Sequence, residues 1–136
     1  MTDDGAIRWK QRLISLGRAI AALDRVADQE HWGEVETSAL IHNFEVVFEL
    51  WWKTLKDRLT HEGLPAIGPR STLREAFAAG LITNDRLAFK ALQARNEFAH
   101  RYDEELAEEA PALICGELLP MLQTELNNLR EAAGDA

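Results

Sequence analysis

The strongest constraint on the fold of this chain is a long helical pattern of apolar residues between Glu36 and His61. Apolar side chains recur there every three or four residues, the spacing that gathers them on one face of an α-helix. The segment contains no proline and no glycine, so nothing in it interrupts a helix. The apolar positions are Leu40, Phe44, Val47, Phe48, Trp51, Leu55 and Leu59. A stripe this wide has to be covered by several other elements, which indicates a helical core.

Three side chains of the same segment lie off the stripe. Glu49 and Lys53 are four residues apart, a spacing at which opposite charges pair on a helix surface. Trp52 falls beside the stripe, so we expect it at the rim of the core or against another chain.

Weaker helical patterns flank this segment on both sides. A first helix is expected over residues 7–30, with Gly33 marking its end. Beyond a loop at 63–69, Thr72 and Glu75 form a capping-box pattern that predicts the start of a short helix, which Gly80 ends. Only four prolines and eight glycines occur in the 136 residues, so long helices are easily accommodated.

Two more helices are expected after Gly80. One begins near Thr83 or Asn84, and the last begins at Asp103, whose carboxylate suits a helix N-terminus. Pro111 and Pro120 predict a bend in this last helix, or a division into two pieces.

The predicted architecture is an all-α, antiparallel, up-and-down four-helix bundle with an additional short helix. We expect a single domain over residues 1–136, with frayed ends at 1–6 and 131–136.

Charge and composition restrict the functional classes. The net charge is −8 and the pI is near 5, which disfavours indiscriminate binding to nucleic acid, so any nucleic acid would have to meet a local basic patch. The single cysteine, Cys115, excludes an internal disulfide. The sequence shows no signal peptide and no apolar run long enough to span a bilayer. These features predict a cytoplasmic protein.

Sequence signals of metal, phosphate-loop and hydrolase sites are missing. The four histidines have no histidine partner at metal-ligand spacing, and neither a glycine-rich phosphate loop nor a nucleophile elbow is present. We therefore expect no metal and no cofactor.

The run from Arg95 to Tyr102 is chemically the most informative segment. Within eight residues it supplies a fixed cation in Arg95, a group that titrates near neutrality in His100 and a phenol in Tyr102. On an ideal helix Arg95 and His100 point about 140° apart, so they converge only if the helix ends or bends near residue 99, or if a second subunit contributes. Asn96, one turn before His100, is placed to orient the imidazole. On spacing alone, the favoured explanation of these residues is a structural one. They would form the C-terminal end of a helix, where the cations interact favourably with the helix dipole.

These residues resemble the HEPN superfamily, in particular the branch of nucleotidyltransferase substrate-binding proteins that includes the HepT toxins. The motif of that branch is Arg, four residues, His, one residue and Tyr, and it is complete here in Arg95, His100 and Tyr102. The resemblance runs from Trp9 to Leu129. It includes three further segments, which are 44–56, 74–82 and the Leu119-Pro120 pair.

The resemblance implies a homodimeric bundle that brings two copies of the motif to one cleft. It also implies metal-independent cleavage of RNA, with His100 moving the proton, Arg95 stabilising the charged phosphorane and Asn96 in support. Arg101, Lys90 and Arg74 are the expected contacts to RNA phosphates.

In this branch the partner is an MntA-like minimal nucleotidyltransferase, the antitoxin of a type VII toxin–antitoxin pair. It silences the toxin by transferring AMP to the motif tyrosine, which here is Tyr102. A bulky anion placed beside Arg95 and His100 would exclude an anionic substrate.

Two other functions stay open. The same dimer could serve as a non-catalytic, nucleotide- or substrate-binding subunit of the nucleotidyltransferase, because such a cleft also uses Arg and His. The other open possibility is a helical dimer with a purely structural role. The intact Arg-His-Tyr set favours the endoribonuclease over the structural dimer, whereas the acidic net charge favours the binding subunit.

Overall fold

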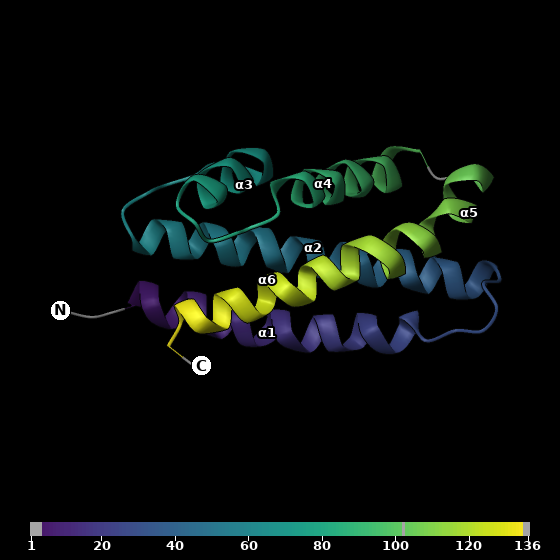
Figure 1. The fold of residues 1–136 in the computed structure, drawn as a ribbon, viewed down its shortest axis with the longest axis horizontal. Coiled ribbons are helices and arrows are strands. Elements are labelled where there is room, and N and C mark those ends of the chain that lie inside the picture. Colours follow the sequence, from purple (N-terminus) through teal and green to yellow (C-terminus); the bar gives the residue numbers. More distant parts are fainter. Residues whose placement is uncertain (1–3, 102, 135–136) are drawn as a thin grey trace.

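A computed structural model of the protein describes residues 4–101 and 103–134, and every regular element in this part of the chain is a helix. Four long segments and one short helix form an antiparallel bundle, which confirms the predicted fold class (Figure 1). The elements are α1 (Asp4–Ala27), α2 (Glu34–His61), α3 (Pro69–Ala78), α4 (Asp85–His100), α5 (Glu104–Leu113), the π-helical turn η1 (Ile114–Leu118) and α6 (Leu119–Ala132).

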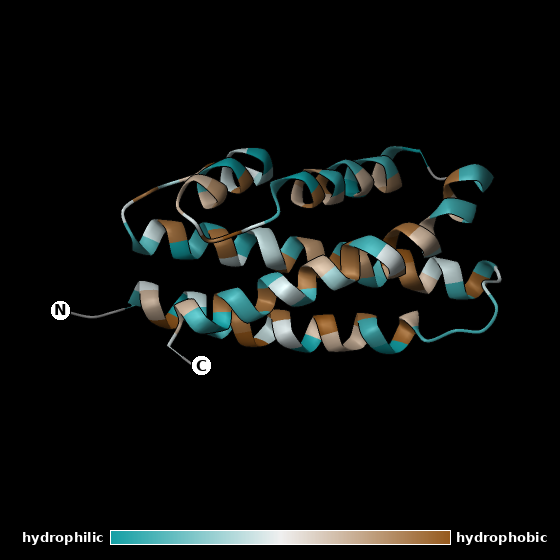
Figure 2. Ribbon diagram, in the orientation of Figure 1, coloured by the Kyte–Doolittle hydropathy of each residue, from teal (hydrophilic) through white to brown (hydrophobic). Residues whose placement is uncertain are grey.

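Helix α2 lies at the centre of the bundle and contacts α1, α3, α4 and α5. In Figure 1, α1 runs antiparallel to α2 on one side, α3 and α4 follow its other side, and α6 crosses in front. All seven apolar positions of the predicted stripe are fully buried. Each large side chain buried in this way contributes roughly 1.5–3 kcal/mol to folding. Bands of opposite hydropathy alternate along the helices in Figure 2, as expected when each helix buries one face.

Two helix boundaries differ from the sequence-based expectation. Helix α1 ends at Ala27, several residues before Gly33, and Gly33 instead precedes α2. The predicted capping box at Thr72 is wrong, because α3 already begins at Pro69. Proline suits the first helical position, since its missing N–H would have no partner there. Thr72 therefore lies inside the helix, where its hydroxyl is buried without a hydrogen-bond partner.

The start of α4 is fixed by one local side chain and one distant carboxylate. The side chain of Asn84 accepts a hydrogen bond from the Leu87 amide at 3.0 Å, which confirms the predicted N-terminus. The fully buried carboxylate of Glu125 on α6 accepts hydrogen bonds from the amides of Thr83 at 2.9 Å and Asn84 at 3.2 Å. This end of α4 is therefore tied to α6.

The last helical segment bends as the two prolines predict. Asp103 caps α5 by accepting a hydrogen bond from the Leu106 amide at 2.9 Å. The π-helical turn η1 lies between Pro111 and Pro120 and separates α5 from α6. Proline removes backbone donors, and a π turn re-pairs the neighbouring carbonyls in a wider register.

Across the described part of the chain, no helix combines the length and the apolar character needed to cross a membrane.

Candidate functional site

Residues 95–100 form the last turns of α4. Arg95, Asn96 and His100 lie on that helix, and Arg101 is the residue that follows it. Phe98 packs edge-on against Phe44 of α2, with ring centroids 5.9 Å apart, and holds this end of α4 against the central helix. Tyr102, the expected site of modification, lies outside the described residues.

Arg95 is bound to α2 through Glu49. One guanidinium nitrogen of Arg95 forms an ion pair with Oε1 of Glu49, and Oε2 of the same carboxylate accepts a 2.7 Å hydrogen bond from the indole of Trp52. The guanidinium also lies 5.9 Å from the centre of the Phe48 ring. About a third of each of the Arg95 and Glu49 side chains stays exposed. The cation is therefore held in one place while part of it faces solvent.

This network corrects two expectations for α2. Glu49 pairs with Arg95, 46 residues away, and Lys53 has no ion-pair partner among the residues that the structure describes. Trp52 is only 9% exposed, and its indole nitrogen is bound to Glu49 within the same chain. Trp52 therefore orients a carboxylate and does not protrude from the rim.

Asn96 connects Arg95 to the side of α4 that carries His100. Its side-chain oxygen accepts a 3.1 Å hydrogen bond from the second terminal nitrogen of Arg95. Asn96 and His100, one turn apart, both line a hollow of about 490 Å³, whereas Arg95 does not line it. His100 is exposed at this hollow. Within one chain, Arg95 thus faces α2 while His100 faces the opposite flank of α4, as the 140° separation predicts.

The hollow continues along α3 and the first part of α4. Arg70 and Phe89 line both the His100 hollow and a second hollow of about 380 Å³, which Arg74 and Phe77 also line. We call the two together the α3–α4 groove. The guanidinium of Arg70 lies 5.9 Å from the centre of the Phe89 ring, and Phe77 is 45% exposed.

The structure separates the three expected phosphate contacts. Arg74 and Arg101 both line the α3–α4 groove, whereas Lys90 is bound to the carboxylate of Glu117 at 2.9 Å and does not line it. Arg101 forms a 2.9 Å ion pair with Asp103.

The charges of this last pair are set by their local contacts. The hydrogen bond from the Leu106 amide, followed by that from Arg101, lowers the pKa of the Asp103 carboxyl. The hydrogen bond with Asp103 raises the pKa of Arg101. Both groups are therefore ionised at neutral pH. The charge of Arg101 is compensated by Asp103, whereas that of Arg74 has no ion-pair partner among the described residues.

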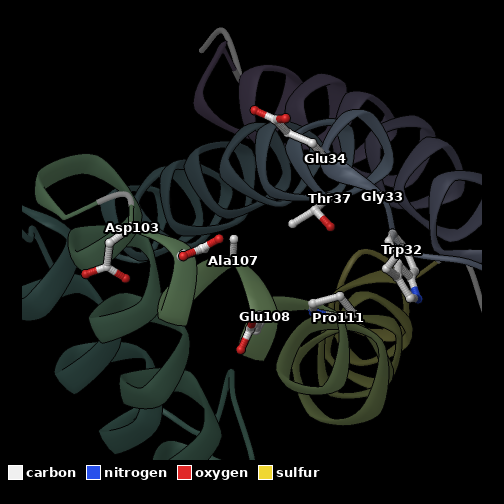
Figure 3. Close-up of a pocket in the computed structure, with 9 residues that line it drawn as sticks. Trp32, Gly33, Glu34, Thr37, Asp103, Ala107, Glu108 and Pro111 are labelled. Carbon is white, nitrogen blue, oxygen red and sulfur yellow. The ribbon is translucent and has the colours of Figure 1, made fainter.

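A larger hollow, of about 660 Å³, lies elsewhere and has the wrong charge for a phosphate. It opens between the start of α2 and the outer side of α5, with Trp32 and Pro111 on one side and Asp103 on the other (Figure 3). Glu34, Glu104 and Glu108 complete an acidic lining, and none of the described residues that line it is a cation. An anionic ligand would be repelled there. The motif and the α3–α4 groove therefore form the candidate site.

Four contributors to this site were not expected from the sequence, which are Glu49, Arg70, Phe77 and Phe89. The spacing of Arg70, Arg74 and Phe77 by four and three residues was a readable signal that they share one face of a helix. Phe89, Asn96 and His100 are separated by seven and four residues and likewise share a face. That Glu49 meets Arg95 could not be read from spacing, because the contact joins two helices.

The arrangement offers a fixed cation, an exposed imidazole and a basic, aromatic groove. A cationic groove of this kind would suit a phosphate placed beside the imidazole. Among the described residues, no three His, Cys, Asp or Glu side chains gather as metal ligands would.

Two comparisons with known proteins found matches, one to a family model and one to a solved structure. A family model described as "Nucleotidyltransferase substrate binding protein like" matches residues 11–131. A crystal structure of a protein from Thermus thermophilus superposes with a TM-score of 0.76 at 32% sequence identity, covering 85% of this chain and 98% of the other. No match was found among functionally curated proteins.

The Glu49–Arg95 pair makes a measurable prediction. In a double-mutant cycle of Glu49→Ala and Arg95→Ala, we expect a coupling of about 0.5–1 kcal/mol in the free energy of unfolding, because the two charges are partly shielded from water. The measurement is urea denaturation of the four variants. A matched cycle of Glu45→Ala with Arg95→Ala, one turn away on α2, is expected to be additive. Additive losses in the first cycle would contradict the pairing.

Proposed function

Because the chain belongs to the family of nucleotidyltransferase substrate-binding-like proteins, we propose that it is the HepT-like toxin of a type VII toxin–antitoxin pair, a metal-independent endoribonuclease. The observation that supports this activity is the placement of Arg95. Its guanidinium is fixed by Glu49 and Asn96 yet remains partly exposed, and Asn96 links it to the hollow that His100 lines.

The proposed reaction is an internal transesterification of RNA. His100 takes the proton from a ribose 2′-hydroxyl, the O2′–P bond forms and the P–O5′ bond breaks. The imidazolium then returns its proton to O5′, so no proton is gained or lost overall. Arg95 stabilises the extra negative charge of the phosphorane, and Asn96 orients the side chains on either side of it.

One chain does not bring Arg95 and His100 to the same side of α4, so the proposal includes a homodimer. The face of α2 next to Arg95 carries Val46, which is 41% exposed, and the half-buried Leu50. These residues line a shallow hollow with Glu49 and Lys53. An exposed apolar patch beside the motif suits a contact between two copies, in which Arg95 of one chain would meet His100 of the other.

The supporting contacts to RNA differ in availability. Arg74 is exposed and has no ion-pair partner within the part of the chain that the structure describes, so it is the most available phosphate contact. Arg101 could exchange Asp103 for a phosphate, whereas Lys90 would first have to leave Glu117. We therefore rank Arg74 first among the three, with Arg101 second.

The proposed antitoxin is an MntA-like nucleotidyltransferase that acts in the same cytoplasm. It would transfer AMP from ATP to the hydroxyl of Tyr102, forming an aryl phosphodiester and releasing pyrophosphate. The added phosphate would lie two residues beyond His100 and would compete with RNA for its positive surroundings.

A non-catalytic function is the second candidate, because the family description itself names substrate binding. In that case the dimer would be the nucleotide- or substrate-binding subunit of a minimal nucleotidyltransferase. The net charge of −8 favours this candidate, because an acidic protein is poorly suited to binding a long anionic RNA.

Cleavage of RNA separates the two candidates. We expect His100→Ala to lower the cleavage rate at least 100-fold, because a positioned general acid–base group typically contributes about that much. The measurement is cleavage of total cellular RNA in the presence of EDTA. His31→Ala, at an exposed histidine before α2, is the matched control and should cleave like wild type. Equal rates for the His100 variant and wild type would remove His100 from the reaction.

Modification of Tyr102 tests the partner. Incubation with the cognate nucleotidyltransferase and ATP should add one or more AMP groups to the peptide that contains Tyr102, because the proposed acceptor of the AMP is the phenol of this tyrosine. The measurement is peptide mass spectrometry. The Tyr102→Phe variant should stay unmodified, since Tyr102 is the only tyrosine of the chain. Modification at another residue, or none, would contradict silencing through Tyr102.

A further inference from the structure

Two helix faces build the α3–α4 groove. Helix α3 contributes Arg70, Arg74 and Phe77, which are separated by four and three residues. Helix α4 contributes six groove residues. Five of them follow one another at intervals of four, four, three and four, which are Asp85, Phe89, Gln93, Asn96 and His100, and Glu97 lies next to Asn96. Because the intervals follow one helical stripe on each side, the groove is continuous from Phe77 to the motif histidine.

The groove is a local exception to the acidic character of the protein. The chain carries a net charge of −8, yet three arginines line the groove against two carboxylates, those of Asp85 and Glu97. Two of the arginines, Arg70 and Arg74, lie on the α3 side. Neither Arg70 nor Arg74 forms an ion pair with any of the described residues. Arg70 packs against an aromatic ring, and Arg74 has neither a carboxylate nor a ring as a partner in the described part of the chain. Free cations that line a groove of an acidic protein mark a place where an anion can bind.

Aromatic rings lie between these cations. The guanidinium of Arg70 lies over the ring of Phe89, and Phe77 on the opposite helix is 45% exposed. An exposed phenylalanine beside arginines combines the two elements by which proteins bind single strands, a stacking surface for bases and a basic track for phosphates. A membrane or a helical protein partner would favour a wider apolar surface than one exposed ring provides.

We propose that the α3–α4 groove binds the segment of single-stranded RNA that flanks the bond to be cleaved. Arg70 and Arg74 hold its phosphates, and the ring of Phe77 stacks on a base. This inference rests on the proposed function, in which RNA is the substrate of His100. It adds the path of the strand and a residue that recognises bases, neither of which the motif supplies.

The length of the groove fits this ligand. Phe89 and His100 are 11 residues apart on α4, which corresponds to about 16 Å at the rise of an α-helix. That distance matches about five nucleotides at the stacked spacing of roughly 3.4 Å. A mononucleotide would occupy only part of it.

The test measures binding with cleavage blocked. The probe is a fluorescent 2′-O-methyl oligoribonucleotide of about 12 nucleotides, within the range of site sizes for such grooves. Its 2′ oxygens cannot attack phosphorus, so the dissociation constant is independent of catalysis. A second probe of the same length lacks the bases but keeps the phosphates.

Each variant has a distinct expected result. Phe77→Ala should weaken binding of the intact probe about tenfold and leave the abasic probe unchanged, since only stacking is lost. Arg74→Ala should weaken both probes and reduce the slope of log K against log salt by about 0.7. Ile14→Ala and Arg18→Ala are matched controls on α1, outside the groove, and neither should change binding.

Three outcomes would overturn the inference. The first is that the wild-type protein does not bind the intact probe, and the second is that both groove variants bind it as tightly as wild type. The third is that the groove variants no longer sediment as dimers and bind RNA more weakly for that reason, which would assign the groove to a contact between two copies of the chain. If the groove variants weaken binding as expected but wild type cleaves no RNA, the groove stands and the ribonuclease proposal fails. If wild type cleaves RNA but the groove variants bind the probe as tightly as wild type, the ribonuclease proposal stands and the groove proposal fails.

Discussion

The central helix, α2, carries an apolar face too wide for any single neighbour to cover, and the other helices are arranged around that requirement. Phe44, Phe48 and Trp51 are fully buried, and their rings contact one another or the ring of Phe98. Helix α1 covers one side of α2 and helices α3 and α4 cover another. Because Phe98 is part of this packing, the end of α4 is fixed relative to α2. The motif on α4 takes its orientation from that contact.

The same packing decides which groups meet at the edge of the core. Glu49 lies where α2 emerges beside α4, and there it binds Arg95 and the indole of Trp52. Asn96 then connects the guanidinium to the far flank of α4, where His100 opens onto the α3–α4 groove. A packed helix pair thus gives the site a fixed cation on one side and an exposed imidazole on the other. The acidic residues that line the hollow beside Asp103 lie in a different part of the molecule from Arg95 and the α3–α4 groove.

Local signals in the sequence predicted the fold well, and long-range contacts limited what could be predicted of the site. The buried stripe of α2, the caps at Asn84 and Asp103 and the bend between the two prolines each depend on neighbouring residues, and all are present. The expectations for Thr72 and Glu49 were wrong because each residue depends on a contact that its own spacing does not show. Pro69 starts α3 before Thr72 can cap it, and Arg95 reaches Glu49 from another helix. Arg70 and Phe77 join the site only because α3 packs beside α4, an orientation that spacing within a helix does not determine.

The central claim is that Arg95 of one chain and His100 of another complete one reactive site. The most direct measurement is RNA cleavage by an equimolar mixture of the inactive Arg95→Ala and His100→Ala variants, co-refolded to exchange subunits. Half of the dimers would then be mixed, and each would retain one intact site of two, so we predict about a quarter of wild-type activity for a two-fold dimer. A mixture as inactive as its two components would contradict the claim, because both residues would then have to act within the same chain.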